Sequence, residues 1–325
     1  MLLARRPRRS LPALAALGMM TPLAWGCAGP DGAEPLAEAP GAAPAIYGGD
    51  EVAPGAWDAV VAIFDDGVLC TGTLVSPRVV LTAGHCLADL EAGELPEVYF
   101  GDGLVEGQTL AVARYGIHPD FCRSCKEDVN DFGFVELAAD RTPSGGFPAP
   151  IADQAAWDAA MAEGASLTLV GYGESDDAPA DPFLGAGVKR EVETTLTTLG
   201  DTGLEFLAGG EGKSTCQGDS GGPAFAPADG GGYRLAGVLA RGECGDASFY
   251  GAPYAALCWL RDEAGADLVP AGCEGCDCLD TAPSGCDCGV PAAPAEEAAE
   301  PALAALVGLG LVCRARARRR ASRPR

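Results

Sequence analysis

Between residue 46 and about residue 268, short apolar or β-branched runs alternate with turns rich in Gly, Pro and Asp. The runs lie at residues 60–64, 73–76, 79–83, 110–113, 167–170 and 233–239. This spacing is typical of strands in an all-β barrel or sandwich rather than of βαβ units. We therefore predict one all-β domain over residues 46–268, closed by a short helix at 255–263.

The residues before this domain have a different pattern. Four arginines within residues 5–9 precede an apolar stretch at 11–23 and then small residues, which is the order of a secretory signal, so residues 1–26 are excluded from the fold. Residues 23–27 resemble a lipoprotein signal, but the bulky Trp25 argues against lipidation of Cys27. Residues 27–45 are rich in Ala, Pro, Gly and Glu and are predicted to be a pro-segment or linker.

Three further segments follow the domain. Residues 269–300 hold a cysteine-rich region, with Gly-Cys-Asp-Cys at 275–278 and 285–288, and a Pro/Ala/Glu linker. Residues 301–325 hold an apolar segment at 302–313 and an arginine cluster. Twelve helical residues rise only about 18 Å, so this segment is short for a membrane span.

Composition narrows the classes of function. The chain has 46 acidic and 22 basic residues and a net charge of −24, which argues against nucleic acid as a partner. A hydrophobic content of 48% allows a substantial core. Fourteen cysteines favour an oxidising compartment, so we predict export from the cytoplasm.

Candidate chemistry begins with the histidines, because the chain has only two. His85 ends an apolar run in Thr-Ala-Gly-His-Cys, whereas His118 precedes Pro119 in a polar segment and is interpreted as structural or solvated. Ser220 lies in Cys-Gln-Gly-Asp-Ser-Gly-Gly-Pro, where the glycines leave its hydroxyl accessible.

Together, these two strings resemble the signatures of the trypsin-like (chymotrypsin-fold) serine endopeptidases. The resemblance runs from Ile46-Tyr47-Gly48-Gly49 through Gly171-Tyr172-Gly173 to the closing helix. It implies two six-stranded antiparallel β-barrels of the chymotrypsin type with a short C-terminal helix. It also implies hydrolysis of protein or peptide substrates with neither metal nor cofactor.

The resemblance assigns a role to each catalytic residue. Ser220 would be the nucleophile, His85 the general base, and Asp131 the carboxylate that orients the imidazole. Asp131 lies in a segment in which Gly133 replaces a larger apolar residue, and Asp128 is the competing choice. The backbone N–H groups of Gly218 and Ser220 would form the oxyanion hole.

Two functions remain open. The first is a secreted or surface-displayed serine endopeptidase, and the second is a protease-like binding or adhesion protein without catalysis. Proteins of the second kind commonly lose a triad residue, and here all three are present. The sequence therefore favours the enzyme.

The family's activation scheme places a cut between Ala45 and Ile46, after which the new amino group would pair with Asp219. Since Ala45 is not basic, we predict an activating protease without trypsin-like preference, or autocatalysis.

The family pattern also locates the residues that bind substrate. The pocket floor falls on Ser214, where members that cleave after Arg or Lys carry aspartate, so cleavage after apolar or small residues is expected. Gly242 would leave one wall open, and Glu243 is a possible source of negative charge. Ala240 and Arg241 replace the usual Ser-Trp pair, so Arg241 would either favour acidic residues upstream of the cut or be solvated.

The cysteines suggest several pairs. The resemblance implies disulfides Cys70–Cys86 and Cys216–Cys244, and Cys122 and Cys125 are expected to form a local bridge. The barrel segment holds seven cysteines and the following segment five, so one bridge between them would let all pair, with Cys258–Cys273 the simplest candidate. An alternative to disulfides in this segment is a zinc site, which ranks below them. Its four thiolate ligands would come from Cys273, Cys276, Cys286 and Cys288.

The order of the C-terminal segments resembles a myxobacterial-type (MYXO-CTERM) sorting tag. This resemblance implies display on the outer envelope of a bacterium, and a bare arginine-flanked anchor is the alternative.

Overall fold

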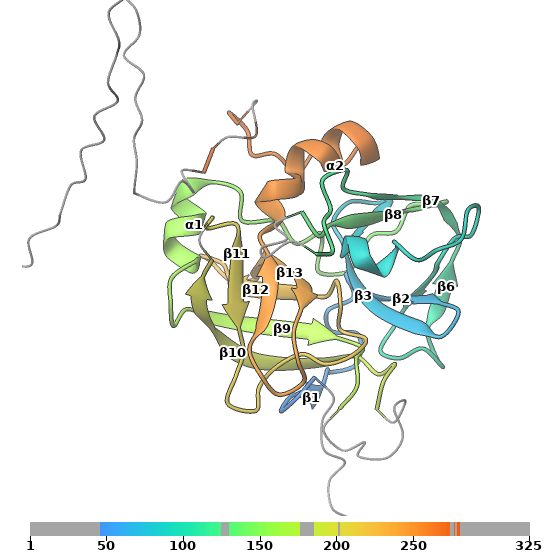
Figure 1. The fold of residues 1–325 in the computed structure, drawn as a ribbon, viewed down its shortest axis with the longest axis horizontal. Coiled ribbons are helices and arrows are strands. Elements are labelled where there is room, and N and C mark those ends of the chain that lie inside the picture. The colour runs from blue at the N-terminus through green and yellow to red at the C-terminus, as the bar shows by residue number, and fades with distance from the viewer. Residues whose placement is uncertain are drawn as a thin grey trace, which may run out of the picture. The chain divides into compact units, whose positions relative to one another are not determined.

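The computed structural model describes residues 46–124, 130–175, 185–200, 202–273, 276 and 278–279. Two antiparallel sheets lie side by side, the N-terminal one blue to green and the C-terminal one green to orange apart from its blue edge strand at Asp50–Glu51 (Figure 1). The N-terminal sheet contains β2 (Val60–Asp65), β3 (Val68–Leu74), β4 (Val79–Thr82), β5 (Glu97–Phe100), β6 (Gln108–Leu110), β7 (Val112–Ile117) and β8 (Gly133–Leu137). The C-terminal sheet contains β1 (Asp50–Glu51), β9 (Ser166–Gly171), β10 (Arg190–Leu199), β11 (Glu205–Ala208), β12 (Pro223–Pro227), β13 (Tyr233–Arg241) and β14 (Ser248–Gly251).

The N-terminal sheet has the strand order β6-β5-β2-β3-β4-β8-β7. Only Ala111 separates its two edge strands, β6 and β7, along the chain. One continuous segment therefore forms both edges, and the sheet must curl back on itself.

The C-terminal sheet closes by hydrogen bonding, because β9 pairs with both β10 and β12. Six strands, β9 to β14, form the ring, and β1 pairs with β10 from outside it. The predicted all-β chymotrypsin fold is confirmed, as one six-stranded barrel and one curled sheet rather than two equivalent barrels.

A shared core joins the two sheets. One cluster of buried side chains combines Leu81 and Phe132 from the N-terminal sheet and its connections with Val170, Phe225 and Val238 from the C-terminal barrel. Burial of this apolar surface fixes the sheets against one another. The loops that leave β4 and precede β8 therefore lie at the junction of the two halves.

Short helices complete the fold: η1 (Gly84–Cys86), α1 (Gln154–Ala160), η2 (Pro253–Ala256) and α2 (Leu257–Ala264). The helix predicted at 255–263 is present as η2 and α2, and α2 ends at Gly265, whose φ of 68° allows the left-handed cap. The sequence did not predict α1. Its seven residues are too few for a clear helical period, although Asp153 caps it through the N–H of Ala156 at 2.9 Å.

The segment after α2 packs onto the body instead of leaving it. The expected bridge between the barrel and this segment exists, but Cys258 pairs with Cys276, so the specific choice of Cys273 was wrong. Cys273 pairs with Cys278. The chain turns back here, because Leu279 is buried in the core and its N–H donates to the Tyr254 hydroxyl at 2.9 Å.

This arrangement bears on two expectations. Cys273 and Cys276 are both in disulfides, so their sulfurs are not available as the thiolates that the zinc alternative needed. Packing also continues beyond residue 268, the predicted end of the domain, to Leu279. Cys286 and Cys288 lie outside the described residues, as do the predicted signal, the pro-segment, the linker and the C-terminal apolar segment.

Within the described ranges, no helix is long and apolar enough to cross a membrane.

Candidate active site

His85 lies in η1, immediately after the buried strand β4. Its Nδ1 is 2.7 Å from Asp131 Oδ2, and its backbone N–H donates to Asp131 Oδ1 at 2.9 Å. A Cβ at Gly84 would lie 3.3 Å from Asp131 Oδ1, so this glycine permits the close approach. One carboxylate therefore holds both the ring and the backbone of the histidine.

Strand register brings Asp131 to this place. Thr82 at the end of β4 pairs with Gly133 at the start of β8, so the residues that follow one strand meet those that precede the other. A Cβ at Gly133 would lie 2.9 Å from the Ala83 carbonyl oxygen and 2.8 Å from a Leu87 methyl carbon. The departure from the family pattern at Gly133 thus has a local reason: the backbones approach too closely for a side chain.

Ser220 belongs to the loop that leads into β12 and contacts the N-terminal sheet through its backbone. Its carbonyl oxygen accepts the Thr71 N–H at 2.8 Å and lies 3.5 Å from Cys86 Sγ. A Cβ at Gly221 would lie 2.1 Å from Thr82 Oγ1, so only glycine fits there. The serine loop is therefore pressed against the strands that deliver His85.

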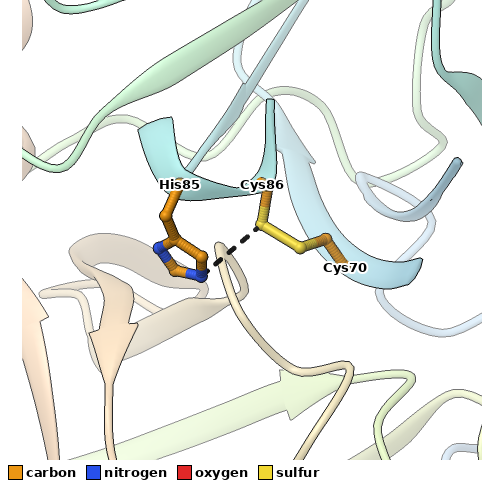
Figure 2. A group of neighbouring side chains, drawn as sticks. All are labelled: Cys70, His85 and Cys86. Carbon is orange, nitrogen blue, oxygen red and sulfur yellow. Dashed lines mark hydrogen bonds between the residues drawn. A yellow bond between two sulfur atoms is a disulfide. The ribbon is translucent and has the colours of Figure 1, made fainter. Parts of the chain in front are cut away.

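Figure 2 shows the neighbours of the imidazole. Cys86 Sγ lies 3.9 Å from His85 Nε2 and is bonded to Cys70 on β3. These three residues are close enough to resemble a metal-ligand group, but both sulfurs are consumed by the predicted disulfide. Since Nδ1 faces Asp131, Nε2 is the ring nitrogen left to act as a base, and among the described residues no hydrogen bond joins it to the Ser220 hydroxyl.

The predicted oxyanion donors have suitable surroundings. Gly218 has a φ of 96°, and a Cβ there would lie 2.9 Å from Gly173 Cα. Thr71 Oγ1 donates to the Gly218 carbonyl at 3.0 Å, which fixes this peptide. Among the described residues, no protein acceptor takes the N–H of Gly218 or of Ser220.

Asp219 is fully buried beside this loop. Its Oδ1 accepts the Gly173 N–H at 2.7 Å and its Oδ2 accepts the Cys216 N–H at 2.8 Å. Burial raises the pKa of Asp219 to about 7, although these two hydrogen bonds and the charge of Arg190 act to lower it. The backbone amides alone thus compensate the buried charge poorly.

The predicted pocket floor is a cluster of hydroxyls. Ser214 Oγ donates to the Asp246 carbonyl and lies 3.3 Å from Ser248 Oγ, while Thr215 Oγ1 donates to Ser248 Oγ at 2.8 Å. All three side chains are buried. A Cβ at Gly242 would lie 2.2 Å from Ser248 Oγ, so the Gly242 backbone lies directly over that serine. Glu243 is exposed.

Arg241 is neither a free cation nor simply solvated. Its guanidinium forms a two-pronged ion pair with Glu205, with Nη2 at 2.9 Å from Oε2. It also lies 4.1 Å above the Phe249 ring. Glu205 is 1% exposed, whereas the Arg241 side chain is 37% exposed, so the arginine serves as counterion to a buried carboxylate.

The remaining candidates have structural surroundings or lie outside the described part. His118 is buried and packs edge-on against Trp259, and burial lowers its pKa despite the charge of Asp120. The second predicted disulfide, Cys216–Cys244, is present, and Cys122 is disulfide-bonded. Asp128 and Cys125 lie outside the described residues.

The paired histidine and aspartate, the serine loop and the two-sheet fold match one known family. The family described as Trypsin matches residues 46–257 of this chain, which is more than half of it. The chain belongs to the trypsin family. This membership makes the domain a serine endopeptidase of the trypsin type, whose substrates as a class are proteins.

Relatives in this family include trypsins, a brachyurin and coagulation factors. Trypsin 5G1 of Aedes aegypti is 28% identical over 203 residues, which cover 59% of this chain and 73% of that protein. Brachyurin of Leptuca pugilator is 28% identical over 193 residues, covering 55% of this chain and 80% of the relative. Coagulation factor XII of Sus scrofa is 30% identical over 200 residues, covering 55% of this chain but only 32% of that longer protein.

Sequence reasoning missed two residues near this trypsin-type site. Ser248 was missed because the segment after Cys244 could not be placed reliably against the family pattern, and only the pairing of β13 with β14 sets it over the floor. Glu205 was missed because a lone acidic residue in an apolar run gives no signal of its partner. The arginine at 241, standing where the family has an aromatic residue, was the available hint.

Proposed function

We propose that this trypsin-family chain is an exported serine endopeptidase in which Ser220, His85 and Asp131 cleave peptide bonds through an acyl-enzyme. The observation that carries the proposal is that the Asp131 carboxylate accepts hydrogen bonds from both the ring and the backbone of His85. An imidazole held this way keeps its proton on Nδ1 and presents Nε2 as the base.

The mechanism follows from this arrangement. Nε2 takes the proton of the Ser220 hydroxyl as the serine attacks the scissile carbonyl, and it later returns the proton to the leaving amine. Asp131 stabilises the imidazolium that forms in between. The N–H groups of Gly218 and Ser220 donate to the oxyanion, and loss of one such donor typically lowers turnover by about 100- to 1,000-fold.

A fluorophosphonate probe tests this proposal directly. The full chain is cut at Ala45, its Ile46 terminus is confirmed by sequencing, and labelling is compared with a Ser220→Ala variant. We expect labelling that the variant lacks. Absence of labelling in correctly cut, folded protein would favour the binding or adhesion protein, and the replacement of Ser-Trp by Ala240 and Arg241 would then be the first place to look.

Activation by a cut between Ala45 and Ile46 is also part of the proposal. Ile46 is completely buried, and its φ of 45° is strained for a β-branched residue, a constraint that a cut before it would release. The Tyr47 carbonyl accepts the Ser214 N–H at 3.0 Å, which couples this segment to the pocket floor. A freed amino group would add a positive charge to that of Arg190 and so lower the pKa of Asp219.

The proposed preference is for small residues before the scissile bond. The Ser214 hydroxyl contacts another hydroxyl and the backbone carbonyls of Thr215 and Asp246, and none of these contacts is with a carboxylate group, so a desolvated Arg or Lys would gain no countercharge at Ser214. Ser248 further shortens the space beneath Gly242. We expect kcat/KM to be highest after Ala and about tenfold or more lower after Phe, as lost space in a pocket typically costs that much. Ser248→Gly should narrow this difference in a peptide library, whereas strong cleavage after Arg by the parent would contradict the assignment.

The proposed location is the exterior of a bacterial cell. The disulfides indicate an oxidising compartment, and the N-terminal segment has the order of an export signal. The C-terminal order of cysteines, apolar residues and arginines supports surface display through a sorting tag. Mass spectrometry of surface-shaved protein tests this, because mature surface protein that retains residues 302–325 would argue against processing of a tag.

A further inference from the structure

A second cavity lies away from the triad and has its own chemistry. It has a volume of about 680 Å³, within the range of small-ligand pockets. Its walls come from four separated parts of the chain: residues 55–59, residues 144–148, Glu191, and Phe225 together with residues 228 and 231–233. None of His85, Asp131 and Ser220 lines it, so catalysis does not account for it.

Aromatic rings dominate one wall. Trp57 stacks on the buried Phe225 ring at 4.9 Å between centroids and 7° between planes, and Tyr233 contacts Trp57 at 4.5 Å. The Phe225 and Tyr233 centroids are only 6.3 Å apart. If Phe225 and Tyr233 lay on opposite faces of the indole, their centroids would be separated by nearly the sum of their distances to the Trp57 centroid, 4.9 and 4.5 Å. Phe225 and Tyr233 therefore do not enclose Trp57 between them, and one indole face is not covered by either ring.

The exposure of this wall is unusual for aromatic residues. Tyr233 is 45% exposed, one of a few large apolar side chains that the described surface presents to solvent. Phe147, from the segment at residues 144–148, also lines the cavity. Exposed aromatic faces that gather in a cavity are typical of binding sites rather than of cores.

Two carboxylates complete the lining. Glu191 Oε2 accepts the Trp57 indole N–H at 2.7 Å, which places negative charge at the edge of the ring. Asp58 accepts the Ser144 N–H; burial alone would raise its pKa, but the hydrogen bonds from Ser144 and Gly145 outweigh burial and leave the pKa lowered. Asp58 is therefore ionised at neutral pH.

No lysine or arginine is among the residues that line the cavity. One compensating cation is Lys189, which is 1% exposed and whose Nζ donates to the Trp57 carbonyl at 3.0 Å and to the Ala56 carbonyl at 3.4 Å. The Lys189 charge partly offsets that of Asp58, but its ammonium group donates to backbone carbonyls. The cavity thus combines aromatic faces with acidic groups and offers no cation of its own.

We infer that this cavity is a binding site for the guanidinium group of an arginine side chain, held against Trp57 and Tyr233 with Glu191 and Asp58 as counterions. A planar, weakly hydrated guanidinium stacks on aromatic rings and pairs with carboxylates, whereas an ammonium loses more hydration on entry. The arginine can belong to another protein or to this chain, which carries seven arginines in its last twelve residues.

The test uses the full chain with Ser220→Ala, so that binding is measured without proteolysis. Isothermal titration calorimetry compares N-acetyl-arginine amide with N-acetyl-citrulline amide, its neutral isostere. We expect millimolar binding of the arginine probe and about tenfold weaker binding of the citrulline probe. Equal binding of the two probes would overturn the inference.

Two variants locate the site. Tyr233→Ala removes an exposed ring, and Glu191→Gln removes the carboxylate beside the indole; each should weaken arginine binding by about three- to tenfold. Glu193→Gln is the matched control, because Glu193 is exposed on the same strand, β10, outside this cavity, and its loss changes the net charge equally. Equal effects of the changes at 191 and 193 would contradict a specific site.

A further variant distinguishes the sources of the arginine. Replacing the seven C-terminal arginines with glutamine should tighten binding of the probe if the chain's own tail competes for the cavity. An unchanged dissociation constant indicates an arginine from another protein. All of these readouts are independent of catalysis, so they stand even if the fluorophosphonate test fails.

Discussion

At the residue scale, the site depends on a carboxylate that does two things. Asp131 Oδ2 orients the imidazole, while Oδ1 holds the His85 backbone. An asparagine at 131 can still accept the His85 backbone N–H through its amide oxygen. Its amide NH₂ group, however, would face His85 Nδ1 and donate to it, where the carboxylate accepts the Nδ1 proton. The imidazole would then take the wrong tautomer, with its proton on Nε2.

We therefore expect Asp131→Asn to lower kcat by about four orders of magnitude with little change in KM. Kinetics on a peptide substrate, with melting curves as a check of folding, measure this. Asp120→Asn is the control, because Asp120 is exposed and lies near the other histidine. Comparable losses in both variants would show that Asp131 acts through general charge and not through the tautomer.

The ion pair between Arg241 and Glu205 gives a second residue-scale prediction. Since Glu205 is 1% exposed, Arg241→Ala should leave a buried charge without a partner and lower the melting temperature by several degrees. Glu205→Gln in the same chain should recover part of that loss, and calorimetry of the two single variants and the double variant measures the coupling. Additive effects would contradict a stabilising pair.

Substrate profiles of the same variants test whether Arg241 also selects acidic residues upstream of the cut.

At the element scale, strand register and disulfides decide which parts of the chain lie in contact. The pairing of β4 with β8 places Thr82 opposite Gly133 and so delivers His85 and Asp131 to one point. The closing helix α2 is tied to the following segment by Cys258–Cys276, and Leu279 inserts into the core of the C-terminal barrel. That segment is thus part of the folded body rather than a free linker.

Removal of this bridge should therefore affect stability more than catalysis. For a Cys258→Ser/Cys276→Ser variant we expect a loss of about 2–4 kcal/mol in the free energy of unfolding, because the unfolded chain regains its freedom. Denaturant unfolding measures the loss, and labelling of Ser220 in the folded variant should persist. An unchanged unfolding midpoint would mean that the segment contributes little to the folded body.

At the scale of the whole molecule, the proposed activation predicts how stability depends on pH. Burial raises the pKa of Asp219 from 3.8 to about 7, so the folded, uncut chain retains a proton that the unfolded chain has released. The stability from this group is fully present below about pH 4 and is lost as the pH rises through 7. A new amino group at Ile46 would lower this pKa and diminish the loss.

Melting temperatures of the Ser220→Ala chain at pH 5 and pH 7.5, before and after the cut at Ala45, test this expectation. The uncut form should lose more stability over this interval than the cut form. Asp219→Asn should remove the difference between the two forms. Parallel curves for the cut and uncut parent would argue against pairing of the new terminus with Asp219.

The strands and disulfides differ in how well the sequence predicted them. Strands such as β2, β4, β9 and β13 were predictable because buried β-branched runs between turns leave few other options. β10 was not predicted, because Glu and Thr fill most of its positions and only Val192, Leu196 and Leu199 are apolar in a strand that is half buried. The disulfides Cys70–Cys86 and Cys216–Cys244 followed from the family resemblance, whereas Cys258–Cys276 did not, because proximity in sequence does not show where the chain turns back.

The sequence by itself determined the all-β class, the family and the residues proposed for catalysis, since these depend on local patterns and motifs that survive without coordinates. Only the tertiary structure decided which groups of distant origin meet: Ser248 over the pocket floor, Glu205 beneath Arg241, and Trp57 with Glu191 and Tyr233 around a cavity. Contacts of this kind arise from strand register and packing across more than thirty residues, and sheet pairing is a property of two segments together. No single stretch of the sequence encodes them.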